Sequence, residues 1–172
     1  MSAETPEFPF MEPSKAVHRR KEPAEFKIIA LRECPTPIEL QECDTPEKAV
    51  AYWRLHIEQG DPRFDPEMEC FVVLFLNTRR RVRGHKLLST GTHDTLLVSP
   101  SIVFRYAVAL PASAILIMHN HPSGRPDPSE ADIKVTRDLI RAGQLLKIDV
   151  VDHVIVGSYG KFCSLRQLGY FY

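Results

Sequence analysis

The stretch His119-Asn120-His121-Pro122 follows an apolar run and begins the most informative part of this chain. On an extended chain residues i and i+2 point to the same side, so both imidazoles reach one ion from a single strand end. Asp132 lies just past a Pro- and Gly-rich loop at residues 122–128 and adds a carboxylate. Two histidines and one carboxylate leave a coordination position open, which is how catalytic zinc is held. The pattern therefore predicts a zinc hydrolase site with His119, His121 and Asp132 as ligands.

The same residues carry a resemblance to a known family. The spacing His-x-His-Pro, six residues, Ser, two residues, Asp resembles the motif of JAMM (MPN-type) metalloproteases. The fuller strings at residues 119–124, 128–132 and 152–157 resemble the bacterial RadC-like branch of that superfamily. The similarity extends from about residue 26 to the C-terminus and is dense from Glu69 onward. It implies an α/β fold with a mixed β-sheet sandwiched by helices, the JAB/MPN architecture shared with cytidine deaminases.

The resemblance also implies roles for further residues. The aspartate that Asp132 matches is the third metal ligand, and the serine that Ser129 matches helps to stabilise the tetrahedral intermediate as an oxyanion donor. The general base of JAMM enzymes is a glutamate just before an upstream apolar stretch, and Glu69, before residues 70–76, matches that place. Glu67, two residues earlier, is the alternative. Such a carboxylate takes a proton from the metal-activated water and returns it to the leaving amine.

Simpler interpretations stay open for several of these residues. The two histidines could also belong to an ordinary polar turn after a strand. Either glutamate could be a solvent-exposed charged residue before a strand. Ser129 and Asp132 approximate a capping box at a helix start, although Glu or Gln is the standard partner of the serine. The two interpretations of this pair are compatible, because a capped first turn would hold the Asp132 carboxylate toward the histidine loop. His153 either orients a ligand through a hydrogen bond or is a satisfied core histidine.

Hydrophobic periodicity predicts alternating strands and helices around this site, which indicates a mixed α/β sandwich. A helix is expected to begin at Pro46, with Thr45 as its N-cap. The uninterrupted apolar run at residues 71–76 is typical of a strand buried on both faces. A Pro-interrupted loop is expected at residues 34–43. The other expected strands lie at residues 26–31, 82–88, 114–118, 150–156 and 161–165, and the other expected helices at residues 100–110 and 129–144.

Composition limits the domain organisation. A chain of 172 residues with 44% hydrophobic and 26% charged residues suits one globular domain. Residues 1–24 are rich in Pro, Glu, Lys and Arg and predict a disordered or loosely attached arm. The domain is expected at residues 25–172, with the metal-site core at about residues 69–165. No apolar run approaches the roughly 20 residues that span a bilayer, and the N-terminus lacks the apolar segment of a secretory signal, so a cytoplasmic location is expected.

Charge and cysteine usage argue against two other kinds of site. The formal net charge is zero, so nothing global favours nucleic acid or a membrane as partner. The arginines between residues 79 and 83 are expected to form a solvated hairpin tip, because no interleaved aromatic residues support nucleic-acid binding. The four cysteines show no Cys-x-x-Cys pairing, which argues against a cysteine zinc site and favours reduced thiols.

Together these features predict a zinc-dependent metallopeptidase or isopeptidase-like amide hydrolase that acts on a peptide or protein substrate, with Zn²⁺ as its cofactor. One alternative is a DNA-associated RadC-like protein, although the helix-hairpin-helix module of longer relatives is not expected in this chain. Another is a non-enzymatic metal-binding module, as some MPN domains are. The chain also departs from the family pattern Pro-Arg-Glu, which usually stands before the helix that precedes the metal strand. Pro100-Ser101-Ile102 stands there, so the charged pair is gone while the zinc ligands are untouched.

Overall fold

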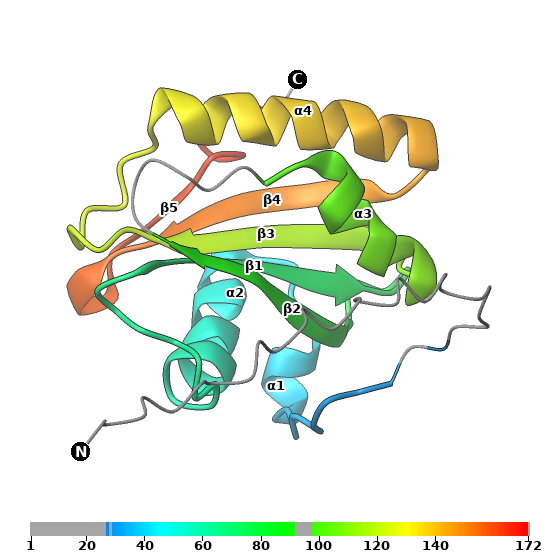
Figure 1. The fold of residues 1–172 in the computed structure, drawn as a ribbon, viewed down its shortest axis with the longest axis horizontal. Helices are drawn as coiled ribbons and strands as arrows, with labels where there is room; N and C mark the ends of the chain where they lie inside the picture. The colour runs from blue at the N-terminus through cyan, green and yellow to red at the C-terminus, as the bar shows by residue number, and fades with distance from the viewer. Residues whose placement is uncertain (1–26, 28, 92–97, 172) are drawn as a thin grey trace, which may run out of the picture.

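A five-stranded mixed sheet lies at the centre of the computed structural model, in the order β2-β1-β3-β4-β5 (Figure 1). The structure describes residues 27, 29–91 and 98–171, so the predicted arm at residues 1–24 lies outside it. Strands β3 and β4 pair in parallel, and the other neighbouring strands pair antiparallel. The strands are β1 (Glu69–Leu76), β2 (Val82–Gly91), β3 (Ala114–Asn120), β4 (Asp149–Val156) and β5 (Phe162–Ser164).

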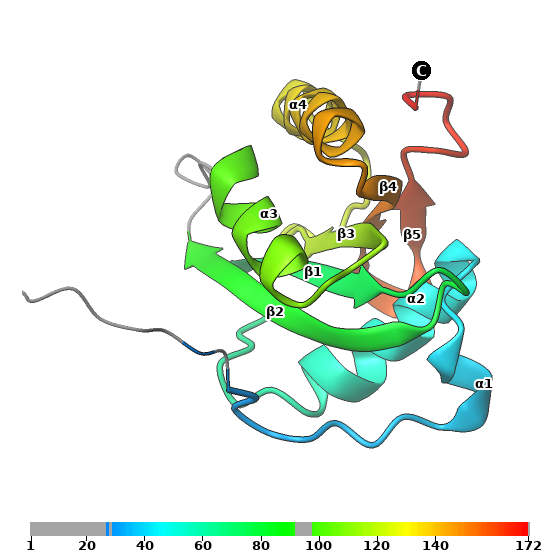
Figure 2. The same ribbon diagram turned by 90° about the vertical axis from the view of Figure 1, so that its right-hand side faces the viewer.

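Helices cover both faces of this sheet, which confirms the predicted fold class. Helices α3 and α4 lie on one face, and α2 lies on the other (Figure 2). Helix α2 begins with Pro46 after the predicted N-cap Thr45, whose side chain accepts a hydrogen bond from the backbone of Lys48. The helices are α1 (Ile38–Gln41), α2 (Pro46–Trp53) with a π-helical continuation η1 (Arg54–Glu58), α3 (Pro100–Ala109), α4 (Glu130–Leu146) and a 3₁₀ turn η2 (Ser158–Gly160).

Strand β1 is buried along its whole length because alternate side chains enter two separate cores. On one face Val72 packs in the core that contains Trp53 of α2. On the other face Val73 packs in the core that contains Phe104 of α3 and Leu139 of α4. The prediction of a strand buried on both faces is therefore confirmed, and it explains why β1 has no polar side after its first residue.

Two predictions for the N-terminal part are wrong. The described residues of the predicted strand at 26–31 are not in a strand, and Ile29 and Leu31 are 68% and 83% exposed. Their apolar character does not produce a strand here, since both side chains remain exposed and gain nothing from packing. The loop expected at residues 34–43 contains helix α1, because Pro37 at its N-cap has a fixed φ that suits a helix start.

Gly143 of α4 lies where the helix end passes closest to the chain entering β4. A Cβ atom added there would lie 2.5 Å from the backbone oxygen of Ile148 and 3.2 Å from Cγ2 of Val150. Alanine improves helix propensity by about 1 kcal/mol, but the overlap with backbone cannot be relieved by a side-chain rotation. We therefore expect Gly143→Ala to lower the free energy of unfolding by about 1–3 kcal/mol in urea titration.

The exposed neighbour Gln144 offers a matched control for this prediction. Gln144→Ala introduces the same side chain one position later, without the close approach, and should change the free energy of unfolding by less than about 0.5 kcal/mol. A Gly143→Ala variant as stable as the wild type would contradict the packing described for the end of α4.

Candidate metal centre

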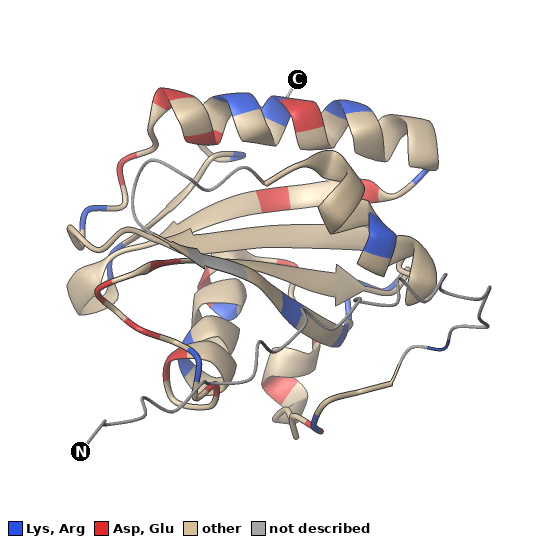
Figure 3. Ribbon diagram, in the orientation of Figure 1, with Lys and Arg blue, Asp and Glu red and all other residues tan. Residues whose placement is uncertain are grey.

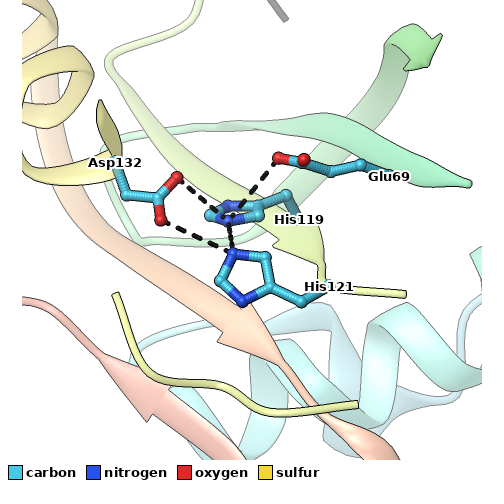
Figure 4. A group of neighbouring side chains, drawn as sticks. All are labelled: Glu69, His119, His121 and Asp132. Atoms are coloured by element: carbon cyan, nitrogen blue, oxygen red, sulfur yellow. Dashed lines mark hydrogen bonds and ion pairs between the residues drawn. The ribbon is translucent and has the colours of Figure 1, made fainter. Parts of the chain in front are cut away.

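Four side chains converge where β3 ends and β1 begins (Figure 4). Glu69 opens β1, His119 lies near the end of β3, His121 follows that strand, and Asp132 lies in the first turn of α4. One potential ligand atom from each lies within 4.8 Å of the others. The structure thus brings together the predicted ligands and the predicted base. The alternative base Glu67 is exposed and takes no part in this cluster.

The strand register explains why these side chains meet. Phe71 of β1 lies opposite His119 of β3, and paired residues in an antiparallel ladder point to the same face of the sheet. Glu69, two residues before Phe71, points to that same face. It is the face covered by α4, whose first turn carries Asp132. Strand parity therefore brings Glu69 and His119 to one face of the sheet, and the first turn of α4 adds Asp132 from above that face.

Distances within the cluster fit the ligand shell of one small ion. Nε2 of His119 lies 3.0 Å from Nε2 of His121 and 3.2 Å from Oδ1 of Asp132. Nε2 of His121 lies 3.5 Å from Oδ2 of Asp132. Tetrahedral ligands at about 2.1 Å from zinc are about 3.4 Å apart, so the two ring nitrogens and the Asp132 carboxylate are spaced as ligands of a single ion. Glu69 lies farther out, with Oε1 3.9 Å from Nε2 of His119.

The first turn of α4 holds Asp132 through a complete capping box. The Ser129 hydroxyl oxygen accepts a hydrogen bond from the Asp132 backbone at 3.2 Å, and the Ser129 backbone donates to Asp132 Oδ2 at 2.8 Å. The hydroxyl also donates to Oδ2 at 2.6 Å. Aspartate therefore completes the box in place of the usual Glu or Gln. This confirms the capping interpretation and leaves Oδ1 facing His119.

The loop after β3 determines which nitrogen of His121 faces the cluster. Nδ1 of His121 lies 2.8 Å from the backbone oxygen of Arg125, and because a carbonyl can only accept, Nδ1 carries the proton. In the neutral ring Nε2 then presents a lone pair toward Asp132. The loop itself is held by Gly124, which has a φ of 71° and accepts a hydrogen bond at 3.0 Å from the backbone of Ser158 after β4.

Electrostatics in the cluster favour positive charge. Burial by itself raises the pKa of Asp132, but hydrogen bonds from His119 and His121 outweigh it and hold that pKa well below its usual range. The hydrogen bond with Asp132 in turn raises the pKa of His121. Both directions have one cause, which is that a protonated imidazole and the ionised carboxylate stabilise each other. Imidazole and carboxylate ligands suit a divalent ion such as zinc.

His153 lies directly behind His119, in the fully buried interior. Its Nε2 is 2.8 Å from Nδ1 of His119, and its Nδ1 is 2.6 Å from the hydroxyl of Thr136. Complete burial holds the pKa of His153 well below its usual value, so the ring is neutral. Of the two interpretations made from sequence, the ligand-orienting one has the geometry it needs, although the partner is an imidazole rather than a carboxylate or carbonyl.

Asn120, between the two histidines, is a residue whose role sequence reasoning missed. The β1–β3 backbone ladder reaches Phe71 and His119, and the Asn120 side chain continues it by one peptide-like unit. Its Oδ1 accepts a hydrogen bond at 2.9 Å from the backbone of Cys70, and its Nδ2 donates at 3.0 Å to the oxygen of Met68. The residues on both sides of Glu69 are thereby fixed. The signal in the sequence was an amide side chain between two histidines at the end of an apolar run.

None of the four cysteines belongs to the cluster. All of them are free thiols, and Cys43 and Cys70 are buried while Cys34 and Cys163 are partly exposed. Burial raises the pKa of Cys43 to about 12, which makes its thiol a poor ligand and a poor nucleophile.

The structure is an α/β sandwich in which two histidines and a glutamate at strand ends meet an aspartate from the first turn of a helix. The RadC-like JAB domain family matches residues 43–170, and the chain belongs to this family. A UPF0758 protein of Bacillus cereus (strain G9842) is 42% identical over 104 residues, which cover 60% of this chain and 46% of that protein. One of Desulforamulus reducens is 42% identical over 105 residues, covering 61% and 46%.

A third similar protein, a UPF0758 protein of Thermosynechococcus vestitus, is 44% identical over 100 residues, covering 58% of this chain and 40% of that protein. The chain therefore spans less than half the length of the curated relatives it matches. Their printed names state no substrate or reaction.

Asn120→Ala tests the two hydrogen bonds by which the Asn120 side chain holds the backbone on both sides of Glu69, here called the Asn120 clamp. The change leaves the Cys70 amide and the Met68 carbonyl without their partner, so we expect the free energy of unfolding to fall by about 1–3 kcal/mol. Hydrogen exchange of the Cys70 amide should accelerate more than that of Val73, an amide in the middle of the same strand. Equal acceleration of the two amides would show that Asn120 contributes to global stability without a specific hold on the start of β1.

Proposed function

We propose that this domain is a zinc-dependent amide hydrolase of the metallopeptidase or isopeptidase kind. The observation that carries the proposal is the placement of Glu69 beside, rather than within, a three-member ligand set. Its Oε1 is 3.9 Å from Nε2 of His119, whereas Oδ1 of Asp132 is 3.2 Å from the same atom. Three protein ligands leave a further coordination position for water, which distinguishes catalytic from structural zinc sites.

The proposed chemistry divides between the ion and the side chains. Zinc supplies a Lewis acid and lowers the pKa of an adjacent water to about 7. Glu69 takes the proton of the attacking water and delivers it to the leaving amine. The Glu69 side chain is 10% exposed, and the hydrogen bonds of Asn120 fix the backbone on both sides of Glu69. A base held in this way needs little reorganisation during the reaction.

Ser129 is proposed as the donor to the carbonyl oxygen of the substrate. It is exposed at the start of α4, within reach of a molecule that enters from solvent. Its hydroxyl donates to Asp132 Oδ2 in the structure, so it would exchange this acceptor for the developing oxyanion as the substrate binds. The serine thus combines a helix-capping role with a proposed catalytic one.

Other partners receive less support. In the arginine-rich turn after β1, Arg80 pairs with Asp149 at 2.7 Å and Arg81 pairs with Glu42 at 3.2 Å, so both guanidinium groups already have carboxylate partners. Basic and acidic residues are interspersed along α4 (Figure 3). Within the described residues no helix is both long and apolar enough to cross a bilayer. A peptide or protein substrate and a cytoplasmic location remain our predictions.

Glu69→Gln separates base catalysis from metal binding. The amide side chain has almost the same shape but accepts no proton, so we expect the variant to keep its zinc and to lose at least about 100-fold in turnover. The assay incubates zinc-loaded protein with a proteome-derived peptide library and detects new N-termini by mass spectrometry. Glu67→Gln, the same substitution at the exposed alternative, should cleave like the wild type.

Two results would contradict the proposal in different ways. Undiminished cleavage by the Glu69→Gln variant would exclude Glu69 as the base. A wild-type protein that binds zinc but cleaves no peptide or isopeptide bond would favour a non-enzymatic metal-binding module. Plasmid cleavage that is lost in a His119→Ala variant would instead support the DNA-associated alternative.

A further inference from the structure

Behind the candidate metal centre, three hydrogen bonds and one close approach arrange four residues in a ring. The Thr136 hydroxyl lies 2.6 Å from the backbone oxygen of Asp132, one turn earlier in α4. The same hydroxyl lies 2.6 Å from Nδ1 of His153, whose Nε2 is 2.8 Å from Nδ1 of His119. Nε2 of His119 then faces Oδ1 of Asp132 at 3.2 Å, which closes the ring.

Counting protons around this ring assigns each donor. A carbonyl oxygen only accepts, so the single proton of the Thr136 hydroxyl is used in its bond to Asp132. Toward His153 the hydroxyl can then only accept, which places the His153 proton on Nδ1. Nε2 of His153 is left as an acceptor, so His119 donates to it from Nδ1. Nε2 of His119 consequently keeps its lone pair.

We propose that Thr136 and His153 are positioning residues that set the tautomer of His119, so that Nε2 is presented as a lone pair for the metal. This inference rests on the metal site of the proposed function and adds a device that prepares one of its ligands. His121 obtains the same tautomer from a backbone carbonyl, that of Arg125. His119 is buried on β3, and the Thr136 hydroxyl acts on it through the imidazole of His153.

The surroundings protect this relay from water. Thr136, His119 and His153 all have 0% exposure, so solvent does not offer alternative partners to their polar atoms. The Phe71 ring stacks on His119 at a centroid distance of 6.0 Å and meets the edge of His153 at 5.8 Å. Both rings are therefore fixed in orientation as well as in protonation, which is the condition for a ligand ready to bind.

Thr136→Val is the decisive variant because it replaces the hydroxyl by a methyl group of similar size. Without an acceptor at Nδ1, His153 should move its proton to Nε2, and His119 should then carry its own proton on the nitrogen that faces the metal. We expect the zinc affinity, measured by competition with a chromophoric chelator, to fall by about 10- to 100-fold. Thr136→Ser keeps the hydroxyl and should bind zinc like the wild type.

The tautomer is read directly by ¹⁵N NMR of the histidine side chains. In metal-free wild-type protein at mildly alkaline pH we expect His153 to be protonated at Nδ1, and in Thr136→Val at Nε2. A wild-type His153 protonated at Nε2 would overturn the inference even if the valine variant failed to fold. Equal zinc affinities of Thr136→Val and Thr136→Ser would overturn it as well.

These outcomes are distinct from a failure of the proposed function. A wild-type protein that binds no zinc would refute the metal site, while the His153 tautomer would still be measurable in the metal-free protein. A wild-type protein that binds zinc with the opposite His153 tautomer would refute the relay alone.

Discussion

The antiparallel register of β1 against β3 is the constraint on which the candidate site depends. With Phe71 opposite His119, strand parity places Glu69 and both histidines on the face covered by α4. A slip of one residue would turn Glu69 to the opposite face and separate it from the histidines. The parallel pairing of β3 with β4 brings in the remaining carboxylate. The chain connects these two strands through α4, and the N-terminus of this helix, which carries Asp132, lies beside the strand ends.

The electrostatic cost of placing imidazoles and carboxylates side by side explains why other groups support the cluster. Lone pairs and carboxylates that face one another in a half-buried site are unfavourable unless a cation or fixed donors compensate them. The capping box at Ser129, the carbonyl of Arg125 and the proposed relay through Thr136 each orient a different proposed ligand. Side chains that are oriented before an ion binds need to move less when it binds. A bound metal ion would then add its binding free energy to the stability of the fold.

The sequence predicted the members of the cluster better than the residues that support them, for a physical reason. His-x-His and Ser-x-x-Asp are local patterns whose geometry follows from one strand and one helix turn. By contrast, Asn120 acts on a partner 50 positions away and Thr136 on one 17 positions away, so their roles depend on the folded sheet. The buried strands and α4 followed from periodicity. The strand expected at residues 26–31 is not formed because apolar residues favour a strand when their side chains are buried by packing, and Ile29 and Leu31 are exposed.

The central claim is that His119, His121 and Asp132 hold one metal ion. Its most direct test is metal content by elemental mass spectrometry, on protein purified without added metal. We predict near-stoichiometric zinc in the wild type and none in the His119→Ala/His121→Ala double variant. Absence of metal from the wild type, even after reconstitution with zinc, would contradict the claim and leave a capped helix beside a polar turn.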